Sequence, residues 1–228
     1  MFRYETHLHT FPVSRCARAS VQENLEFYKK AGYDGVFITN HFLDGNINFD
    51  RTRPYEEGIR FYFSDYEEGV RIGKALDMKV FCGVEISYKG TDFLIYGLDK
   101  QWFLDHPEIM TLKLREKLDL MAESGAAVIQ AHPFREVSYI DHVRLFPRNV
   151  HGVEMINACC TEFENKMARI YAENYGLIPF AGSDNHAAGR KNLLAGVCCQ
   201  EPVSDEWDFI NKIKAGKMEL FTLANEEA

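Results

Sequence analysis

Several histidines and acids of this 228-residue chain stand at positions that suit metal binding. His7 and His9 lie two residues apart in a predicted strand over Phe2–His9, so the two-residue period of a strand places both imidazoles on one face. Glu5 is two residues earlier, and we expect it on the same face, where it would orient one of the imidazoles. Such a pair of imidazoles can hold one metal ion.

Further groups that can bind metals follow other predicted strands, each where an apolar run gives way to a loop. In an α/β barrel the carboxyl ends of the strands open to one mouth, so residues remote in sequence converge there. We therefore expect one pocket to contain seven ligand groups, which are His7, His9, His41, Glu85, His132, Asp184 and His186.

The donor types in this set favour transition metals. Imidazole nitrogen and carboxylate oxygen suit zinc, iron or manganese, whereas calcium prefers oxygen ligands and structural zinc prefers cysteines. Because these groups are too many for one tetrahedral ion, we predict two or three divalent metal ions (Mn, Fe or Zn), some of them bridged by Glu85 or another carboxylate. Such a centre positions a phosphoryl group and generates hydroxide from bound water near neutral pH. It would hydrolyse a phosphoester by in-line attack, without another cofactor.

The elements that must position these groups are short apolar runs that alternate with longer amphipathic stretches. Ser20 and Glu23 fit a capping box at the start of the first helix, and Gly32 fits its end. The amphipathic stretches predict helices over Ser20–Ala31, Tyr55–Leu76, Pro107–Glu123, Thr161–Tyr175 and Asp205–Ala215. The apolar runs predict strands over Phe2–His9, Gly35–Thr39, Lys79–Glu85, Phe93–Tyr96, Ala127–Ala131, Gly152–Ile156, Ile178–Gly182, Ala195–Cys199 and Glu219–Thr222.

This alternation predicts an α/β fold, with a parallel sheet that is closed or covered by helices. The length is slightly below the ~250 residues of an eight-unit barrel, which favours a smaller or distorted barrel, with a doubly wound open sheet as the alternative. No G-x-G-x-x-G follows a predicted strand, which disfavours dinucleotide binding. Because composition does not shift along the chain, we expect residues 1–228 to form a single domain.

The overall charge points to a small substrate. The formal net charge is −8, which disfavours nucleic acid as a partner because non-specific binding to it depends on basic surface. Bound metal ions would then attract a small anion locally. The polar start of the chain does not resemble a signal peptide, and no stretch approaches the ~18 apolar residues of a membrane span, so we expect a cytoplasmic protein without membrane contact. Most of the six cysteines are expected to be reduced core residues.

The motifs around the predicted ligands resemble those of the polymerase and histidinol phosphatase (PHP) superfamily. They occur in the family's order and at compatible spacings: His7-Leu8-His9-Thr10, Thr39-Asn40-His41, Gly83-Val84-Glu85, Ala131-His132-Pro133 and Gly182-Ser183-Asp184-Asn185-His186. The resemblance implies a distorted (β/α)7 TIM-like barrel of the PHP type, with a two- or three-metal site that hydrolyses phosphomonoesters or phosphodiesters. Asp184, His132 and Glu85 would be its catalytic residues.

The resemblance also implies how the ligands are shared among the metals. His7, His9, Glu85 and Asp184 would surround the first metal, Glu85 and His132 the second, and His41 and His186 the third. Many members have an Asp for the third metal in a Ser-Asp-Gly context, whereas this chain has Val13-Ser14-Arg15-Cys16. The third site would then be weaker, stay partly empty or use Cys16, although we expect Cys16 to be an unreactive thiol.

Other polar residues near the motifs are candidates for supporting roles. Glu154 and Asn157, in a segment that resembles the family's Gly-x-Glu-x-x-Asn, are expected to lie just outside the metal ligands. Arg135 and Arg190 are candidates for binding the substrate phosphate through a bidentate fork, and Arg15 is a weaker third. For these arginines the alternative is an exposed salt bridge.

The leading functional hypothesis is a phosphatase acting on a small phosphomonoester, such as histidinol phosphate or a nucleotide. A phosphodiesterase or 3′–5′ exonuclease acting on nucleic acid ends is the first alternative. A degenerate PHP domain that serves as a non-catalytic binding or scaffold module is the second. The near-complete ligand set argues against degeneration. The sequence shows no heptad seam and gives no indication of the oligomeric state.

Overall fold

The computed structural model describes residues 1–189 and 193–224. Each predicted strand is present, and β3 continues beyond its predicted end at Glu85 to Tyr88. The elements in chain order are β1 (Phe2–Leu8), α1 (Val21–Lys30), β2 (Gly35–Ile38), α2 (Tyr55–Ala75), β3 (Lys79–Tyr88), β4 (Thr91–Tyr96), α3 (Lys100–Asp105), a 3-10 turn η1 (Pro107–Met110), α4 (Leu114–Glu123), β5 (Ala127–Gln130), β6 (Gly152–Asn157), α5 (Glu162–Tyr175), β7 (Ile178–Gly182), β8 (Leu193–Cys199), α6 (Glu206–Lys214) and β9 (Glu219–Ala224).

The strands form one sheet in the order β7-β6-β5-β4-β3-β2-β1-β8-β9. Strands β1, β2 and β3 pair in parallel, as do β5, β6 and β7. The expectation of an all-parallel sheet is wrong, because β4 runs antiparallel to β3 and β5, and β8 runs antiparallel to β1 and β9. The β3–β4 connection is a tight hairpin, which leaves no room for the crossover helix that a parallel pair requires.

The sheet curls until its two halves meet, which makes it a nearly closed barrel. At the meeting point the chain after β7 contacts the end of β1. The His9 N–H donates to the Asn185 carbonyl at 3.0 Å, and the Thr6 hydroxyl donates to the Ala181 carbonyl at 2.6 Å. The prediction of a distorted barrel, and not a doubly wound open sheet, is therefore confirmed.

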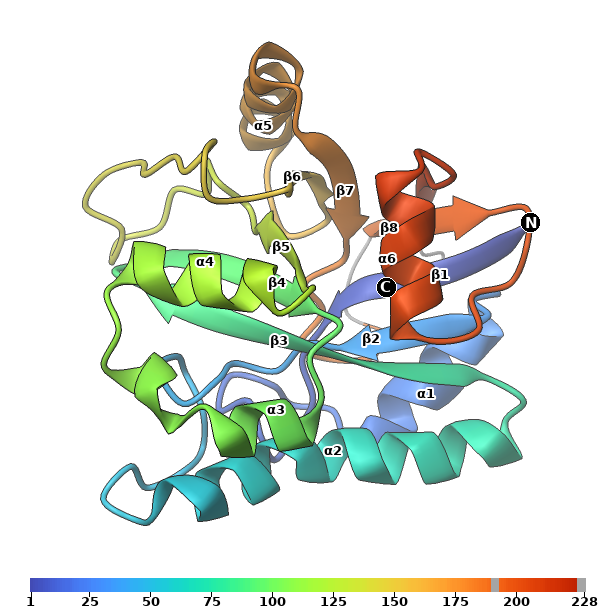
Figure 1. The fold of residues 1–228 in the computed structure, drawn as a ribbon. Coiled ribbons are helices and arrows are strands. Elements are labelled where there is room, and N and C mark those ends of the chain that lie inside the picture. The colour runs from blue at the N-terminus through green and yellow to red at the C-terminus, as the bar shows by residue number, and fades with distance from the viewer. Residues whose placement is uncertain (190–192, 225–228) are drawn as a thin grey trace.

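Helices cover the outside of the sheet. Figure 1 shows α2 and α3 along one side and α5 beside β6 and β7, at the opposite end of the molecule. The predicted capping box is present, with the Ser20 side chain and the Glu23 side chain each accepting the other residue's backbone N–H. Gly32 follows α1 with a φ of +82°, the left-handed conformation expected of a helix-ending glycine.

One helical prediction differs in detail. The stretch predicted as a helix over Pro107–Glu123 divides into η1 and α4. A short helix that the sequence did not predict, α3, precedes η1. The Asp99 side chain starts α3 by accepting the Trp102 N–H at 2.8 Å.

The end of the barrel where the parallel strands begin is closed by α6. Phe209 of α6 packs against Phe37, Tyr96 and Phe180, with ring centroids 4.1, 5.5 and 5.9 Å away, and Ile213 belongs to the same buried cluster. The opposite end of the barrel, where the parallel strands finish, is left for polar side chains.

The sequence predicts no membrane-spanning segment and mostly reduced cysteines. Among residues 1–189 and 193–224, no helix combines the length and apolar composition needed to cross a membrane. No disulfide joins cysteines within the described residues; Cys82, Cys198 and Cys199 are buried, and Cys16, Cys159 and Cys160 are half-buried.

Candidate metal centre

The seven predicted ligand groups lie together at the ends of the parallel strands. His7 is near the end of β1, and His9 follows that strand. Four of the other groups follow β2, β5 and β7, namely His41, His132, Asp184 and His186, whereas Glu85 lies within β3, just beyond the part that pairs with β2. Their ligand atoms form three groups within which all atoms lie inside 4.8 Å of one another: His7 with Glu85 and His132, His7 with His9 and Asp184, and His9 with His41 and His186.

Glu85 is the central carboxylate of this cluster. One oxygen, Oε1, lies 3.2 Å from His7 Nε2 and 3.6 Å from His132 Nε2. The other oxygen, Oε2, lies 3.4 Å from His9 Nε2 and 2.5 Å from His41 Nδ1. Each oxygen therefore faces a different group of imidazoles, which is the arrangement that a bridging ligand requires.

The residues present fit divalent cations. Glu85 Oε2 and His41 Nδ1 are both buried and face each other as an ion pair, and neither makes a hydrogen bond of normal geometry among the described residues. Leaving buried polar atoms unpaired costs free energy, and atoms of this kind are stabilised when they bind a metal. With imidazole and carboxylate as the only donor types in the three groups, the site suits zinc, iron or manganese.

The charges of the cluster keep its carboxylates ionised. Burial alone would raise the pKa of Glu85, but the imidazoles of His41 and His7 hold it well below its usual range. The pKa of Asp184 is likewise lowered, since His7, His9 and the neighbouring imidazoles together outweigh the effect of burial. Burial, with His186 and His41 nearby, lowers the pKa of His9 well below its ordinary value. Burial acts the same way on His7, His41 and His132, but the nearby carboxylates raise the pKa of these three imidazoles, so a bound metal would have to displace their protons.

The predicted supporting residues Glu154 and Asn157 lie directly behind the ligands. Glu154 Oε1 lies 2.9 Å from His7 Nδ1, while Oε2 accepts the His132 backbone N–H at 3.1 Å and the Asn157 amide at 2.9 Å. Glu154 thereby fixes the ring orientation of His7 and leaves Nε2 directed at Glu85.

Glu5 does not share a face with His7, which corrects the sequence expectation. The pairing of β1 with β2 shifts register between Glu5 and Leu8, so the alternation of faces is interrupted there. Glu5 lies against Tyr28 of α1, and its Oε1 accepts the backbone N–H groups of His7 and Ser183, each at 2.9 Å. It joins the backbones of β1 and the segment after β7 and does not orient an imidazole.

Two of the predicted ligands have unusual backbone conformations. His132 has a φ of +24° and Asp184 a φ of +51°, a region that residues with a side chain rarely occupy. Such strain costs on the order of 1–3 kcal/mol per residue and is found preferentially at functional sites. The positions of these two side chains are therefore maintained against a local backbone penalty.

The three arginines predicted to bind the substrate phosphate lie in different places. Arg135 lines the cavity over the cluster, which has a volume of about 620 Å³, and its Nη1 lies 3.2 Å from Asp184 Oδ2. Arg15 lines a neighbouring cavity instead, beside Arg51. Arg190 lies outside the described residues.

Sequence reasoning missed Asp92, which also lines the cavity over the cluster. Its Oδ2 lies 3.8 Å from His132 Nε2, and burial and then the charge of Glu85 raise its pKa. Asp92 stands near the start of β4, and the start of a parallel strand would lie at the other end of the barrel. Only the antiparallel direction of β4 brings it to the mouth, and that direction was not predicted. Arg51 and Tyr139 line the same cavity and were also missed.

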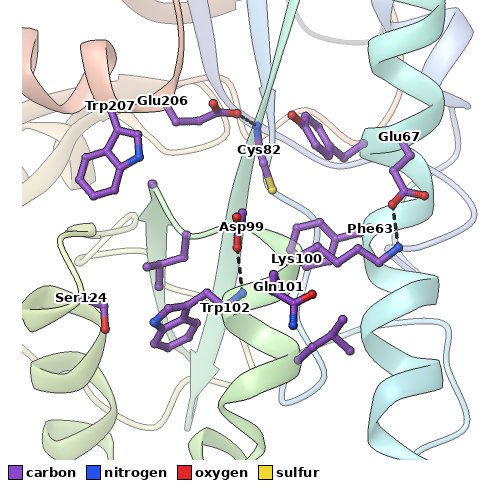
Figure 2. Close-up of a pocket in the computed structure, with 14 residues that line it drawn as sticks. Phe63, Glu67, Cys82, Asp99, Lys100, Gln101, Trp102, Ser124, Glu206 and Trp207 are labelled. Atoms are coloured by element: carbon purple, nitrogen blue, oxygen red, sulfur yellow. Dashed lines mark hydrogen bonds and ion pairs between the residues drawn. The ribbon is translucent and has the colours of Figure 1, made fainter.

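A second cavity, of about 730 Å³, lies away from the cluster and contains none of the seven predicted ligands. Figure 2 shows its charged residues turned toward partners within the protein. Glu206 accepts the Cys82 backbone N–H at 2.9 Å, and Lys100 pairs with Glu67 at 2.7 Å. With these groups already engaged, this cavity lacks the converging donors of the metal cluster.

Comparison with known proteins supports the fold more than any specific activity. No known family profile matches the sequence. An uncharacterized protein of Methanocaldococcus jannaschii is 35% identical over 112 residues, which are 46% of this chain and 45% of that protein. The matched region thus spans about half the length of this curated relative.

Several solved structures share the architecture at low sequence identity. A two-domain protein of Bacteroides vulgatus that contains a predicted PHP-like metal-dependent phosphoesterase has a TM-score of 0.66 at 12% identity, over 96% of this chain and 64% of that one. A Bifidobacterium adolescentis protein whose name suggests a metal-dependent phosphoesterase has a TM-score of 0.58 at 12% identity, over 93% and 95%. An amidohydrolase of Chromobacterium violaceum with bound sulfate has a TM-score of 0.56 at 12% identity, over 95% and 97%. The chain therefore has the PHP-type barrel fold, and the resemblance drawn from its motifs is confirmed at the level of the fold.

Proposed function

We propose that this chain is a metal-dependent hydrolase of small phosphomonoesters. The observation that carries the proposal is the convergence of seven imidazole and carboxylate groups from distant parts of the chain. Five of them line one cavity, and His7 and His9 are buried against these five. The fold shared with proteins named as metal-dependent phosphoesterases supports it.

We propose that the ligands hold two or three divalent cations. His7, His9, Glu85 and Asp184 would hold one, with Glu85 and His132 on a second, and His41 and His186 on a third. Cations bound there would supply Lewis acidity for the phosphoryl oxygens and lower the pKa of water. In this arrangement Asp184, His132 and Glu85 are the catalytic residues.

Residues of the chain would bind and orient the substrate. The Arg135 guanidinium lines the cavity 3.2 Å from the Asp184 carboxylate, where a phosphate group could receive its two parallel N–H donors. Glu154 holds the His7 ring through Nδ1, and Asn157 donates to both Glu154 and Asp184, at 2.9 and 3.4 Å. These contacts keep the ligands in place before substrate binds.

The substrate class follows from size and charge. A cavity of about 620 Å³ suits a small molecule, and the net charge of −8 disfavours nucleic acid ends. The sulfate bound in the amidohydrolase structure is consistent with an oxyanion ligand for this fold. That same relative favours one alternative reaction, hydrolysis of a carbon–nitrogen bond.

The test combines metal content with a substrate screen. Metal per chain would be measured first, and the protein would then be assayed with Mn²⁺, Fe²⁺ or Zn²⁺ against phosphomonoesters, short oligonucleotides and cyclic amides. Preferential release of phosphate from monoesters supports the proposal. Turnover confined to oligonucleotides or amides replaces it with the corresponding activity, and a chain that binds no metal and turns over no substrate would be a binding module.

The control is a substitution in the second cavity. Trp207→Ala alters a residue that lines that cavity and contributes nothing to the metal cluster. It should leave phosphate release unchanged, whereas Arg135→Ala should raise KM for a phosphomonoester. Equal effects of the two substitutions would show that Arg135 does not bind the phosphate.

A further inference from the structure

Cys16 lies at one corner of the metal cluster, in the segment between β1 and α1. It is half-buried and lines the cavity over the cluster together with His41 and His186. Both of these imidazoles act on the thiol and lower its pKa, against the effect of burial. The third predicted metal site therefore has a sulfur atom beside it.

The backbone around Cys16 is held by hydrogen bonds on both sides. The Ser14 N–H donates to the Thr10 carbonyl at 3.0 Å, and the Arg15 N–H donates to the Asn46 carbonyl at 2.9 Å. The Ala17 N–H donates to the Ser14 carbonyl at 3.1 Å. An anchored turn thus holds Cys16 at the cavity that His41 and His186 also line.

A second observation at the same corner points to a ligand. Glu85 is only 1% exposed, yet its Oε2 has no hydrogen-bond partner among the described residues. This oxygen forms an ion pair with His41 Nδ1 at 2.5 Å, and that nitrogen likewise makes no hydrogen bond of normal geometry within the described residues. The ring nitrogens of His9, His41 and His186 lie within 4.8 Å of one another. Nitrogen and oxygen donors therefore meet at one place, and Cys16 lines the same cavity.

The types of donor determine which cation this corner would prefer. Residues Val13 to Cys16 include no carboxylate, so the hard oxygen ligand that would favour manganese or magnesium is absent from that turn. A thiolate with two imidazoles is a softer set, which favours zinc or iron(II) and tetrahedral geometry.

We propose that Cys16 is a thiolate ligand, with His41 and His186, of a zinc- or iron-selective cation in the third position. This inference rests on the proposed function, because it assumes that the cluster holds metals. It goes further in assigning a ligand, and it makes the third position chemically different from the other two, whose donors are imidazoles and carboxylates.

Cobalt(II) provides a direct readout, since a cobalt–thiolate bond gives a charge-transfer absorption in the near ultraviolet that nitrogen and oxygen ligands do not give. The metal-free full-length protein would be titrated with Co²⁺ alone. We expect this band in the wild type and in the matched control Cys160→Ser, a half-buried thiol that does not line the cavity. Cys16→Ser should lose the band and about one tightly bound zinc per chain.

A second variant separates loss of the ligand from loss of the fold. Cys16→Asp offers a hard oxygen in place of sulfur, so it should bind a third cation with a preference moved toward manganese, and without the cobalt band. Wild-type protein that binds Co²⁺ without the band would overturn the inference, as would a band that persists in Cys16→Ser. Both results leave phosphomonoester hydrolysis by the Mn²⁺-loaded protein as an independent test of the proposed function.

Discussion

Replacement of Glu154 by glutamine should test whether this residue determines which ring nitrogen of His7 carries the proton and which one can bind a metal. Three groups face its carboxylate: His7 Nδ1 at 2.9 Å, the His132 backbone N–H at 3.1 Å and the Asn157 amide at 2.9 Å. All three act as donors when His7 carries its proton on Nδ1 and offers Nε2 to a cation. Glutamine keeps the shape of the side chain but has only one acceptor oxygen.

Neither orientation of the new amide satisfies all three donors. If its oxygen faces His132 and Asn157, its NH2 group faces His7 and forces the proton onto Nε2, which then cannot bind a metal. Metal affinity should fall roughly 10- to 100-fold, or about 1.4–2.7 kcal/mol. If the oxygen faces His7, two buried donors lose their acceptor, at about 1–3 kcal/mol each. The Tm of the metal-free protein would then fall by roughly 2–4 °C per kcal/mol.

The assay therefore requires two measurements on Glu154→Gln: zinc affinity by competition with a chromophoric chelator, and thermal unfolding of the metal-free protein. Glu164→Gln is the matched control. Glu164 also accepts backbone N–H groups, from Glu136 and Thr161, each at 2.6 Å, but it faces no imidazole of the cluster. It should lose stability and keep its zinc affinity. A Glu154→Gln protein with both zinc affinity and Tm equal to the wild type would refute the reasoning.

Three further predictions concern the cluster, a buried acid and the closed end of the barrel. Asp184→Ala or His132→Ala should reduce phosphate release at least about a hundredfold while circular dichroism shows the fold retained, and full activity in either variant would remove that residue from the site. Burial raises the pKa of Glu5 from about 4.5 to about 7, so the folded state binds this proton more tightly and stability should fall as pH rises through that range, by about 3 kcal/mol. Urea unfolding at pH 5 and pH 8 should show this loss for the wild type relative to Glu5→Gln, and equal pH dependence in both proteins would contradict it. Phe209→Ala should cost about 3–5 kcal/mol in urea unfolding because it removes a fully buried ring from α6, and a cost below 1 kcal/mol would show that α6 does not stabilise the barrel.

Most of the secondary structure could be predicted from the sequence because its signals are local. Apolar runs bounded by turn residues marked the strands, and the capping box at Ser20 and Glu23 marked the start of α1. The ligand cluster was also predictable, since groups that follow parallel strands meet at one mouth. His7 and Asp184 could thus be brought together although most of the chain separates them.

The features that sequence reasoning missed depend on strand direction and register. Asp92 reaches the mouth because β4 runs antiparallel, and nothing in a short apolar run specifies its direction. The side chains of Glu5 and His7 lie on different faces because the register shifts between Glu5 and Leu8, and a strict two-residue period cannot include such a shift. Both errors arise from pairing between strands, which is set by the whole sheet.

The position of α6 constrains how molecules would move through this protein. Its Phe209, Ile210 and Ile213 fill the end of the barrel with apolar side chains, so the interior offers no passage from one end to the other. The substrate and both products of a hydrolysis would therefore enter and leave through the cavity over the metal cluster. Inorganic phosphate still bound in this cavity would block the next substrate molecule. Accumulating phosphate should therefore inhibit turnover competitively.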